Sequence, residues 1–237
     1  MKSPREIKDI AKKNLVEYWG LAVVALLMYS VLLGIGVNFA FSFSNGFKVS
    51  SNSSSSIIAV FLAPVTIGYL SVHYNIFKND NPDFSDLFKG FRDDYFTKVI
   101  VLFVKQLFTV LWFFVFIIPG FIKAFSYSMT EYIIQDDYFK EDGINAITLS
   151  RKMMDGHKME LLGLLLSFFG WFILTALTAG VLWLYVGPYV TQATTVFYEE
   201  VKLKYCKQLG LQYNQDEIEG YYQSSQTDKK DDDLYYE

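Results

Sequence analysis

The sequence has few of the residues that build metal, redox and catalytic sites. Its 237 residues include one cysteine, Cys206, and two histidines, His73 and His157. A single cysteine excludes an intrachain disulfide, and neither histidine stands in an HExxH or other metal-ligand spacing. The serine-hydrolase, P-loop and dinucleotide-binding motifs are also absent. We therefore expect no metal, no cofactor and no catalytic residue, and we interpret the protein as a non-enzyme.

Charge is missing from long stretches of the chain. No Asp, Glu, Lys or Arg occurs from Tyr18 to Phe47, and residues 99–118 carry only Lys105. A helix rises about 1.5 Å per residue, so about 20 apolar residues cross a hydrocarbon core of about 30 Å. The composition agrees, since 52% of the residues are hydrophobic and the mean hydropathy is +0.22. These features favour a membrane protein over a soluble domain.

The apolar segments predict an all-α, polytopic membrane protein with six transmembrane helices. A turn at Pro119-Gly120 separates the third helix from the fourth, because proline cannot donate a backbone hydrogen bond and glycine accepts unusual dihedrals. The last helix continues past Tyr198, and we expect it to have left the bilayer at Lys202. The six segments are about 19–43, 57–77, two within 98–137, 161–177, and one that starts near Val181 or Pro188.

Amphipathic segments and an acidic tail surround these spans. Residues 1–17 are expected to form a helix on the membrane surface, with Pro4 in its first turn. The six-helix domain covers 18–209, and the acidic residues of 210–237 predict a disordered cytoplasmic tail. Connectors 81–98 and 142–158 also predict interfacial helices. Apolar residues recur at helical spacing on the first helix (Ile7, Ile10, Ala11, Leu15) and on the first connector (Phe84, Leu87, Phe88, Phe91, Tyr95).

The distribution of lysine and arginine predicts the orientation. Of the 21 basic residues, 18 lie in the amino terminus, the 78–98 and 138–158 loops and the segment from Lys202 onward. By the positive-inside tendency, both termini face the cytoplasm. Because these basic segments flank apolar helices and alternate with acids, we expect anionic lipid headgroups as partners and no nucleic acid.

The chain contains an internal repeat of uneven register. Three times an amphipathic segment is followed by an apolar helix, a proline near the far side and a second helix with polar positions. The three prolines are Pro64, Pro119 and Pro188. The repeat predicts three helical hairpins arranged around a pseudo-axis.

The second helix of each hairpin carries polar residues on one face. Spacings of three and four residues put each set on one side of its helix. Polar groups that face hydrocarbon are costly, so these faces should meet inside the bundle. Two interpretations remain open: interhelical hydrogen bonds that hold the bundle together, or a cavity for a ligand or ion. The candidate polar interior comprises Thr66, His73, Lys123, Tyr127, Glu131, Gln192, Thr195 and Glu199.

Two lysines fall inside apolar segments, where a charge costs at least about 2.5 kcal/mol. Lys105 lies about a turn and a half inside the expected cytoplasmic boundary, and we interpret it as snorkelling to the headgroups. Lys123 follows the Pro-Gly turn near the outer boundary. Its ion pair with Glu131 on the same helix is excluded, because the helical rise separates the two residues by about 12 Å. Any partner must therefore come from another helix.

Several short motifs carry a resemblance to a known family. They are Ile118-Pro119-Gly120, Tyr127-Ser128-Met129, Ser150-Arg151, Gly156-His157-Lys158, Gly170-Trp171 and Pro188-Tyr189. On these residues the chain, from its amino-terminal helix to about Leu203, closely resembles the bacterial integral-membrane family catalogued as domain of unknown function 975. The resemblance implies a polytopic helical protein of the bacterial cytoplasmic membrane. It implies no activity, because the family has no assigned catalytic residues.

Three hypotheses of function follow from these observations. The leading one is a non-enzymatic membrane component, accessory or immunity-like, that binds a lipid, peptide or protein partner. The alternative is a transporter or channel for a small molecule or ion, which requires a continuous water-accessible path lined by the candidate polar interior. A membrane enzyme is third, because the Glu199-Glu200 pair is similar to the paired glutamates of some intramembrane proteases but lacks suitably spaced histidines.

Overall fold

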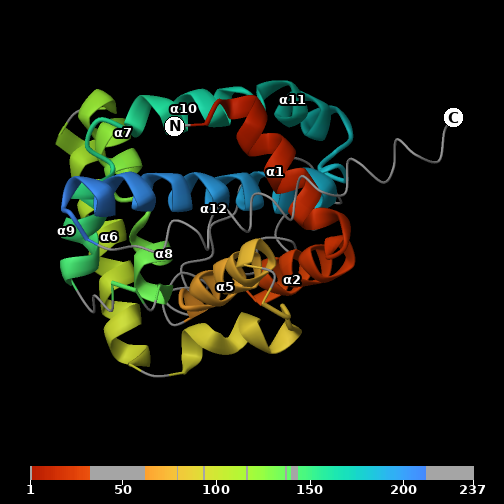
Figure 1. Ribbon diagram of the computed structural model, residues 1–237, viewed down its shortest axis with the longest axis horizontal. Helices are drawn as coiled ribbons and strands as arrows, with labels where there is room; N and C mark the ends of the chain where they lie inside the picture. The colour runs from red at the N-terminus through yellow and green to blue at the C-terminus, as the bar shows by residue number, and fades with distance from the viewer. Residues whose placement is uncertain are drawn as a thin grey trace, which may run out of the picture. The chain divides into compact units, whose positions relative to one another are not determined.

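Helices form almost all of the regular structure in the computed structural model (Figure 1). The structure describes residues 2–32, 62–78, 80–92, 94–115, 117–136, 138–139 and 144–211, and no strand occurs among them. Parts of the first two predicted spans, the serine-rich sequence 50–56 that separates them and almost all of the acidic tail lie outside these residues. The chain divides into two compact units. The first comprises Met1–Trp19, His73–Pro82 and Glu160–Glu237, and the second comprises Gly20–Val72 and Asp83–Met159.

The long helix α12, Trp183–Gln208, is the centre of the first unit. Helix α1, Pro4–Val16, packs across it (Figure 1). Ser3 and Glu6 form a capping box at the start of α1, and Pro4 occupies its first turn. The apolar face of α1 is buried, with exposed fractions of 7% or less at Ile7, Ile10, Ala11 and Leu15.

This burial shows a protein contact for the apolar face of residues 1–17, a segment that is expected to lie on the membrane surface. An amphipathic helix offers the same apolar stripe to a lipid surface and to a protein partner, so periodicity alone does not distinguish the two. In this structure the stripe packs against α12.

The predicted fifth span, 161–177, is two helices. Helix α10, Lys158–Leu166, and helix α11, Phe169–Leu177, are bent by 42° at a short break. The break contains Phe168, whose side chain is fully buried with its ring edge-on to Tyr189 at 5.0 Å between centroids. Lys8 of α1 lies 4.8 Å from the Phe168 ring centroid and donates a hydrogen bond to the Ser167 carbonyl oxygen at 3.2 Å. The bend therefore turns Phe168 into the core of the unit.

The second unit contains a helical hairpin of α6, Tyr95–Val115, and α7, Ile117–Ser126. Helix α6 ends at Val115 and α7 begins at Ile117, so the break between the two helices precedes the predicted turn at Pro119-Gly120 by a few residues. Pro119 lies in the first turn of α7, where its missing N–H leaves no helical hydrogen bond unmade. A Cβ on Gly120 would come within 2.7 Å of the Phe113 ring, so glycine allows the two helices to approach closely.

The predicted fourth span is also interrupted. Helix α8, Thr130–Gln135, follows α7 after a turn at 127–129. Helix α9, Ile144–Met153, packs against α6, α7 and α8. A small core joins these helices, made of Val101, Tyr127 and Ile147 with Val104 and Ile134 around it.

The first connector forms a 3₁₀ helix, η1, Phe84–Phe91, and not the α-helix that its apolar spacing predicts. Asp83 caps this helix, and hydrogen bonds from the Ser85 side chain and from the backbone of Phe84 and Ser85 lower the pKa of Asp83. Only some of the expected apolar face is covered, since Leu87 is buried whereas Phe88 is 42% exposed. Tyr95 belongs to α6 instead.

Two glycines allow η1 to lie against helix α5, Val65–Lys78, and the turn before it. A Cβ on Gly68 would lie 1.7 Å from the carbonyl oxygen of Leu87, and a Cβ on Gly90 would lie 1.8 Å from that of Pro64. Both neighbours are backbone atoms, which cannot rotate away as a side chain can. The close approach of backbones, and not apolar periodicity, therefore determines the conformation of the connector.

We expect Gly68→Ala to destabilise the protein by about 1–3 kcal/mol, because the new methyl group forces η1 away from α5. The matched control is Gly163→Ala in the interior of α10, where a Cβ meets nothing within 4 Å. That control should gain about 0.5–1 kcal/mol from the lower backbone entropy of the unfolded chain. Thermal unfolding of both variants in mild detergent tests the prediction, and equal midpoints for the two would contradict it.

Among the described residues, one helix is long and apolar enough by itself to cross a membrane, at Tyr95–Phe113. The number rises to three if each of two bent pairs counts as one span: α1 with α2, Trp19–Leu32, and α10 with α11. The all-α prediction is thus confirmed for the described residues, whereas six spans are not shown. Of the three helical hairpins that the repeat predicts, the described residues of the second unit show one, α6 with α7.

Candidate functional site

A row of buried polar residues runs along α12 in the first unit. Gln192, Thr195, Glu199 and Lys202 follow one another at helical spacing, and each is at most 1% exposed. The Gln192 side-chain oxygen lies 2.9 Å from Nδ1 of His73, a fully buried residue of α5. Two of the polar faces that the sequence predicts therefore meet in this unit, through a direct side-chain hydrogen bond.

Lys202, at which we expect α12 to have left the bilayer, is buried within the first unit. Its Nζ lies 3.7 Å from Oε1 of Glu199 and 3.3 Å from the hydroxyl oxygen of Tyr74. The rings of Tyr74 and Tyr198 lie with their centroids 5.9 Å from the same nitrogen. A lysine near the carboxyl end of a helix usually indicates solvent, but here carboxylate, hydroxyl and aromatic groups surround its charge.

Glu200 contacts a different lysine from Glu199. Its carboxylate accepts a hydrogen bond from Nζ of Lys2 at 2.7 Å, and its side chain is 10% exposed. The backbone N–H of Lys2 also donates to it, at 3.4 Å. The neighbouring glutamates thus point to separate cations, and the amino-terminal segment is held against α12.

The second unit contains an ion pair between Lys105 of α6 and Glu131 of α8. The lysine and glutamate side chains are 17% and 15% exposed. This pair corrects the interpretation of Lys105 as a snorkelling residue, and it supplies the partner from another helix that Glu131 requires. Of the remaining candidates, Tyr127 is buried in the α6–α9 core and Thr66 is half-buried on α5.

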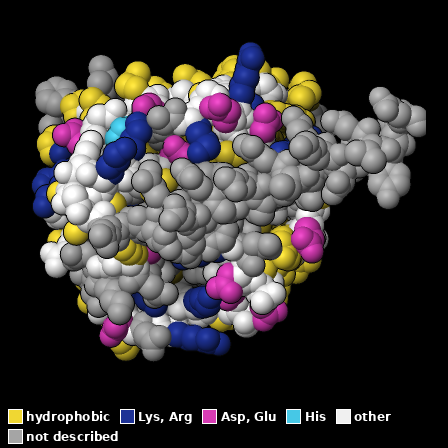
Figure 2. Space-filling view, viewed as in Figure 1, with side chains coloured by type: hydrophobic (Ala, Val, Ile, Leu, Met, Phe, Trp, Pro, Cys, Tyr) yellow, Lys and Arg dark blue, Asp and Glu magenta, His cyan; other side chains and the backbone are white. Residues whose placement is uncertain are grey.

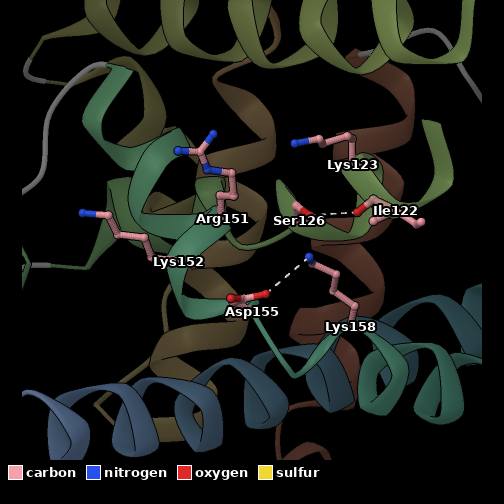
Figure 3. A pocket seen from close by; sticks show the side chains of 7 residues that line it. All are labelled: Ile122, Lys123, Ser126, Arg151, Lys152, Asp155 and Lys158. Atoms are coloured by element: carbon pink, nitrogen blue, oxygen red, sulfur yellow. Dashed lines mark hydrogen bonds and ion pairs between the residues drawn. The ribbon is translucent and has the colours of Figure 1, made fainter. Parts of the chain in front are cut away.

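A basic pocket with a volume of about 370 Å³ opens between α7, α9 and the start of α10 (Figure 3). Lys123 of α7 reaches toward the side of the pocket from which Arg151 of α9 projects, while the Arg151 guanidinium is turned away from Lys123 and Lys158 points to Asp155 at 3.8 Å. The Lys123 Nζ also lies 4.8 Å from the ring centroid of Trp112 on α6. The lining residues are Ile122, Lys123, Ser126, Arg151, Lys152, Asp155 and Lys158.

This pocket brings together residues that the sequence assigns to opposite membrane boundaries. Lys123 was expected near the outer boundary, and the 138–158 connector on the cytoplasmic side. The structure places Arg151 and Lys152 of that connector beside Lys123. The difference arises because α9 packs along α6 and α7 and does not remain apart as a surface connector.

Ser150 holds the part of α9 that carries the pocket residues Arg151 and Lys152. The sequence did not indicate this role. The Ser150 hydroxyl donates to the Ser126 carbonyl oxygen at 2.9 Å and accepts from the Met129 backbone N–H at 3.2 Å. It therefore satisfies two backbone groups of the turn between α7 and α8. The neighbouring Arg151 is held beside α7 as a result. The adjacent Ser-Arg pair was visible in the sequence only as part of the family resemblance.

The arrangement suits the binding of an anion better than the binding of a metal. In the part of the chain that the structure describes, no group of three or more His, Cys, Asp or Glu side chains could hold a metal ion. The basic pocket instead offers four cationic side chains and one carboxylate.

Comparison with known proteins gives one match. The family model described as "Protein of unknown function (DUF975)" matches residues 1–126 and 113–204, which together reach from the first residue to residue 204. No curated protein and no solved structure matches the chain.

Proposed function

The chain belongs to the family described as "Protein of unknown function (DUF975)", and we propose that it is a non-enzymatic component of the bacterial cytoplasmic membrane that binds anionic lipid headgroups. A protein partner in the same membrane fits the accessory role. The proposal includes six transmembrane segments with both termini in the cytoplasm. The concentration of basic residues in alternate loops supports this orientation.

The exposed apolar face of α6 carries the proposal. Several large apolar side chains along this helix are exposed. The exposed fractions are 74% for Phe96, 56% for Ile100 and 53% for Leu107. The segment Tyr95–Phe113 contains two charged residues. Lys98 lies near its start, and Lys105 forms an ion pair with Glu131. An apolar surface of this length, with its internal charge paired, suits a hydrocarbon environment better than water.

Basic connectors beside this helix support anionic lipid as the partner. Lysine and arginine near the end of a membrane helix attract anionic headgroups by about 1 kcal/mol each. On the face shown in Figure 2, basic side chains are interspersed with acidic ones, unlike the continuous basic surface that a nucleic acid requires. Lipid headgroups therefore fit the charge pattern better than nucleic acid does.

The transporter alternative receives less support from the geometry. It requires a continuous water-accessible path along the candidate polar residues. His73 and Gln192 instead bond directly to each other, and Glu131 pairs directly with Lys105. Such contacts favour the interpretation that the polar residues hold helices together.

We expect Leu107→Asp to impair membrane insertion, with a cost of about 2.5–3.5 kcal/mol for a carboxylate near the middle of a span. Alkaline carbonate extraction should leave the unaltered protein in the membrane fraction and release or deplete the variant. Val16→Asp is the matched control, because Val16 is 67% exposed at the end of α1 and outside α6. Extraction of the unaltered protein by carbonate, or an equal loss in the control, would refute the membrane role of α6.

Single cysteines at Ser54 and Ser224, in a background with Cys206 replaced by alanine, test the proposed orientation. A membrane-impermeant thiol reagent applied to intact cells should label the cysteine at position 54 and leave the one at position 224 unlabelled. The reverse pattern would overturn the topology without affecting the expected lipid contact of α6.

A further inference from the structure

We infer that the basic pocket formed by α7, α9 and residues 155–158 of the second unit binds a phosphate monoester. This inference rests on the proposed function, because it names one ligand for a protein that is proposed to bind anionic lipid. The pocket is open to solvent, and its volume of about 370 Å³ is large enough for a small ligand.

The charges at the pocket are unbalanced. Four of the seven lining residues are Lys or Arg, and the one acid, Asp155, lies 3.8 Å from Lys158. Lys123 and Arg151 have no ion pair with any carboxylate in the described part of the chain. Cations held on facing helices repel one another until an anion lies between them. A dianion would neutralise most of this charge.

The chemistry of the two facing cations favours phosphate oxygens. The guanidinium of Arg151 presents parallel N–H donors that match two oxygens of one phosphate group. The ammonium of Lys123 supplies a point charge from another helix, and Figure 3 shows it reaching toward the side of the pocket from which Arg151 projects. Ser150 holds the backbone beside Arg151 to the α7–α8 turn, so the two sides of the pocket are fixed relative to one another.

Ile122 is the one apolar residue among those that line the pocket, and the hairpin carries further apolar side chains outside the lining. Ile122 is 47% exposed, and the adjacent Phe121 is 56% exposed. Trp112 of α6 lies beneath the Lys123 ammonium. A lipid with a terminal phosphate would place its charge on Arg151 and Lys123 while its chains contact these apolar side chains. A soluble phosphate would use the same cations and leave these apolar side chains uncovered.

The test uses the full-length protein in lipid nanodiscs of phosphatidylcholine. One preparation contains phosphatidic acid, a phosphate monoester, and a second contains the same molar fraction of phosphatidylglycerol, a diester. Lipid bound to the purified protein is quantified by mass spectrometry, and inorganic phosphate is titrated as a soluble competitor. The variants are Arg151→Gln and Lys123→Gln, with Arg92→Gln as the matched control. Arg92 is exposed in the same unit and away from the pocket.

We expect preferential retention of phosphatidic acid and a loss of affinity of about tenfold or more in Arg151→Gln, as for removal of a charged hydrogen-bond partner. Arg92→Gln should bind normally, and all variants should keep the thermal midpoint of the unaltered protein. Retention of phosphatidic acid that phosphate does not displace assigns the site to lipid, whereas binding of inorganic phosphate alone assigns it to a soluble ligand.

Three results would overturn the inference. They are equal retention of the two lipids, equal losses in Arg151→Gln and Arg92→Gln, and no binding of either phosphate source. If the protein nevertheless resists carbonate extraction, the proposed membrane role stands and only the phosphate site is wrong. Release by carbonate would instead contradict the membrane role itself.

Discussion

Replacement of Lys105 by methionine is expected to destabilise the protein by about 3–5 kcal/mol, because it leaves the Glu131 carboxylate without its cation in a largely buried site. Both side chains are less than one fifth exposed in the second unit, and the surrounding surface of α6 is apolar. Methionine keeps the length of the side chain, so the loss reports the charge and not a cavity. Denaturant-induced unfolding in mild detergent measures the change.

A double-mutant cycle separates the pair from its surroundings. Glu131→Gln alone should also be destabilising, whereas Lys105→Met with Glu131→Gln should recover most of the stability, because neither charge is then left without the other. Lys98→Met is the control on the same helix. Lys98 donates to carbonyl oxygens of the preceding turn and should lose no more than about 1 kcal/mol. Additive effects of the two α6–α8 replacements would show that the ion pair contributes no coupling energy.

For Lys105, the sequence predicts the position of a charge within an apolar segment but not the residue that pairs with it. Composition identified Lys105 as the one charge in an apolar segment, and helical rise excluded pairing within the fourth span. Nothing local distinguishes snorkelling from pairing, because both use the same long side chain on the same helix. The choice depends on where α8 returns along α6, which is a tertiary contact.

Element boundaries were predictable where a strong local signal exists. Residues 99–118 carry no charge except Lys105 and predict a helix. The structure has this helix at Tyr95–Val115, close to the expected segment. The 3₁₀ connector η1 and the bend at Phe168 were not predictable, because both depend on contacts with distant segments. In η1 the deciding contacts are those of Gly68 and Gly90 with backbone oxygens. Apolar spacing carries no information about such an approach.

The candidate polar residues divide between the two units. His73, Gln192, Thr195 and Glu199 belong to the first, where a direct hydrogen bond joins α5 to α12. Spacing along a helix could place residues on a common face, and it did so for α12. It could not identify Tyr74 or Lys202 as members of the cluster, because a lysine in a charged carboxyl-terminal segment has the pattern of a solvated residue.

The basic pocket could not be predicted from the sequence, because it too depends on contacts between distant segments. Its cations come from α7 and from a connector that is separated from α7 by the whole of α8. The count of loop charges predicts only the orientation of the chain, and the sequence around Lys123 shows only a single charge within an apolar segment. The adjacency of Lys123 and Arg151 follows from the packing of α9 on the hairpin, where Ser150 bonds to the α7–α8 turn.

The buried lysine of α12 leads to a second large effect. Lys202→Met should destabilise the first unit by about 3–5 kcal/mol, because the Glu199 carboxylate loses a cation where both side chains are 1% exposed. The hydroxyl of Tyr74 also loses its contact with the ammonium. The charge pattern alone would instead predict a solvated lysine whose removal changes little. Denaturant-induced unfolding of the full-length protein distinguishes these expectations.

Lys204→Met provides the matched control two residues along the same helix. Lys204 lies 4.0 Å from Glu160, and the two side chains are 35% and 42% exposed, so its removal should cost no more than about 1 kcal/mol. Lys202→Met combined with Glu199→Gln should recover much of the stability lost by Lys202→Met, because the carboxylate that needs the cation is gone. A stability loss in Lys202→Met no larger than that in Lys204→Met would mean that water reaches Lys202. In that case α12 would carry a solvated charge at this position, and the transporter alternative would regain a polar residue in contact with water.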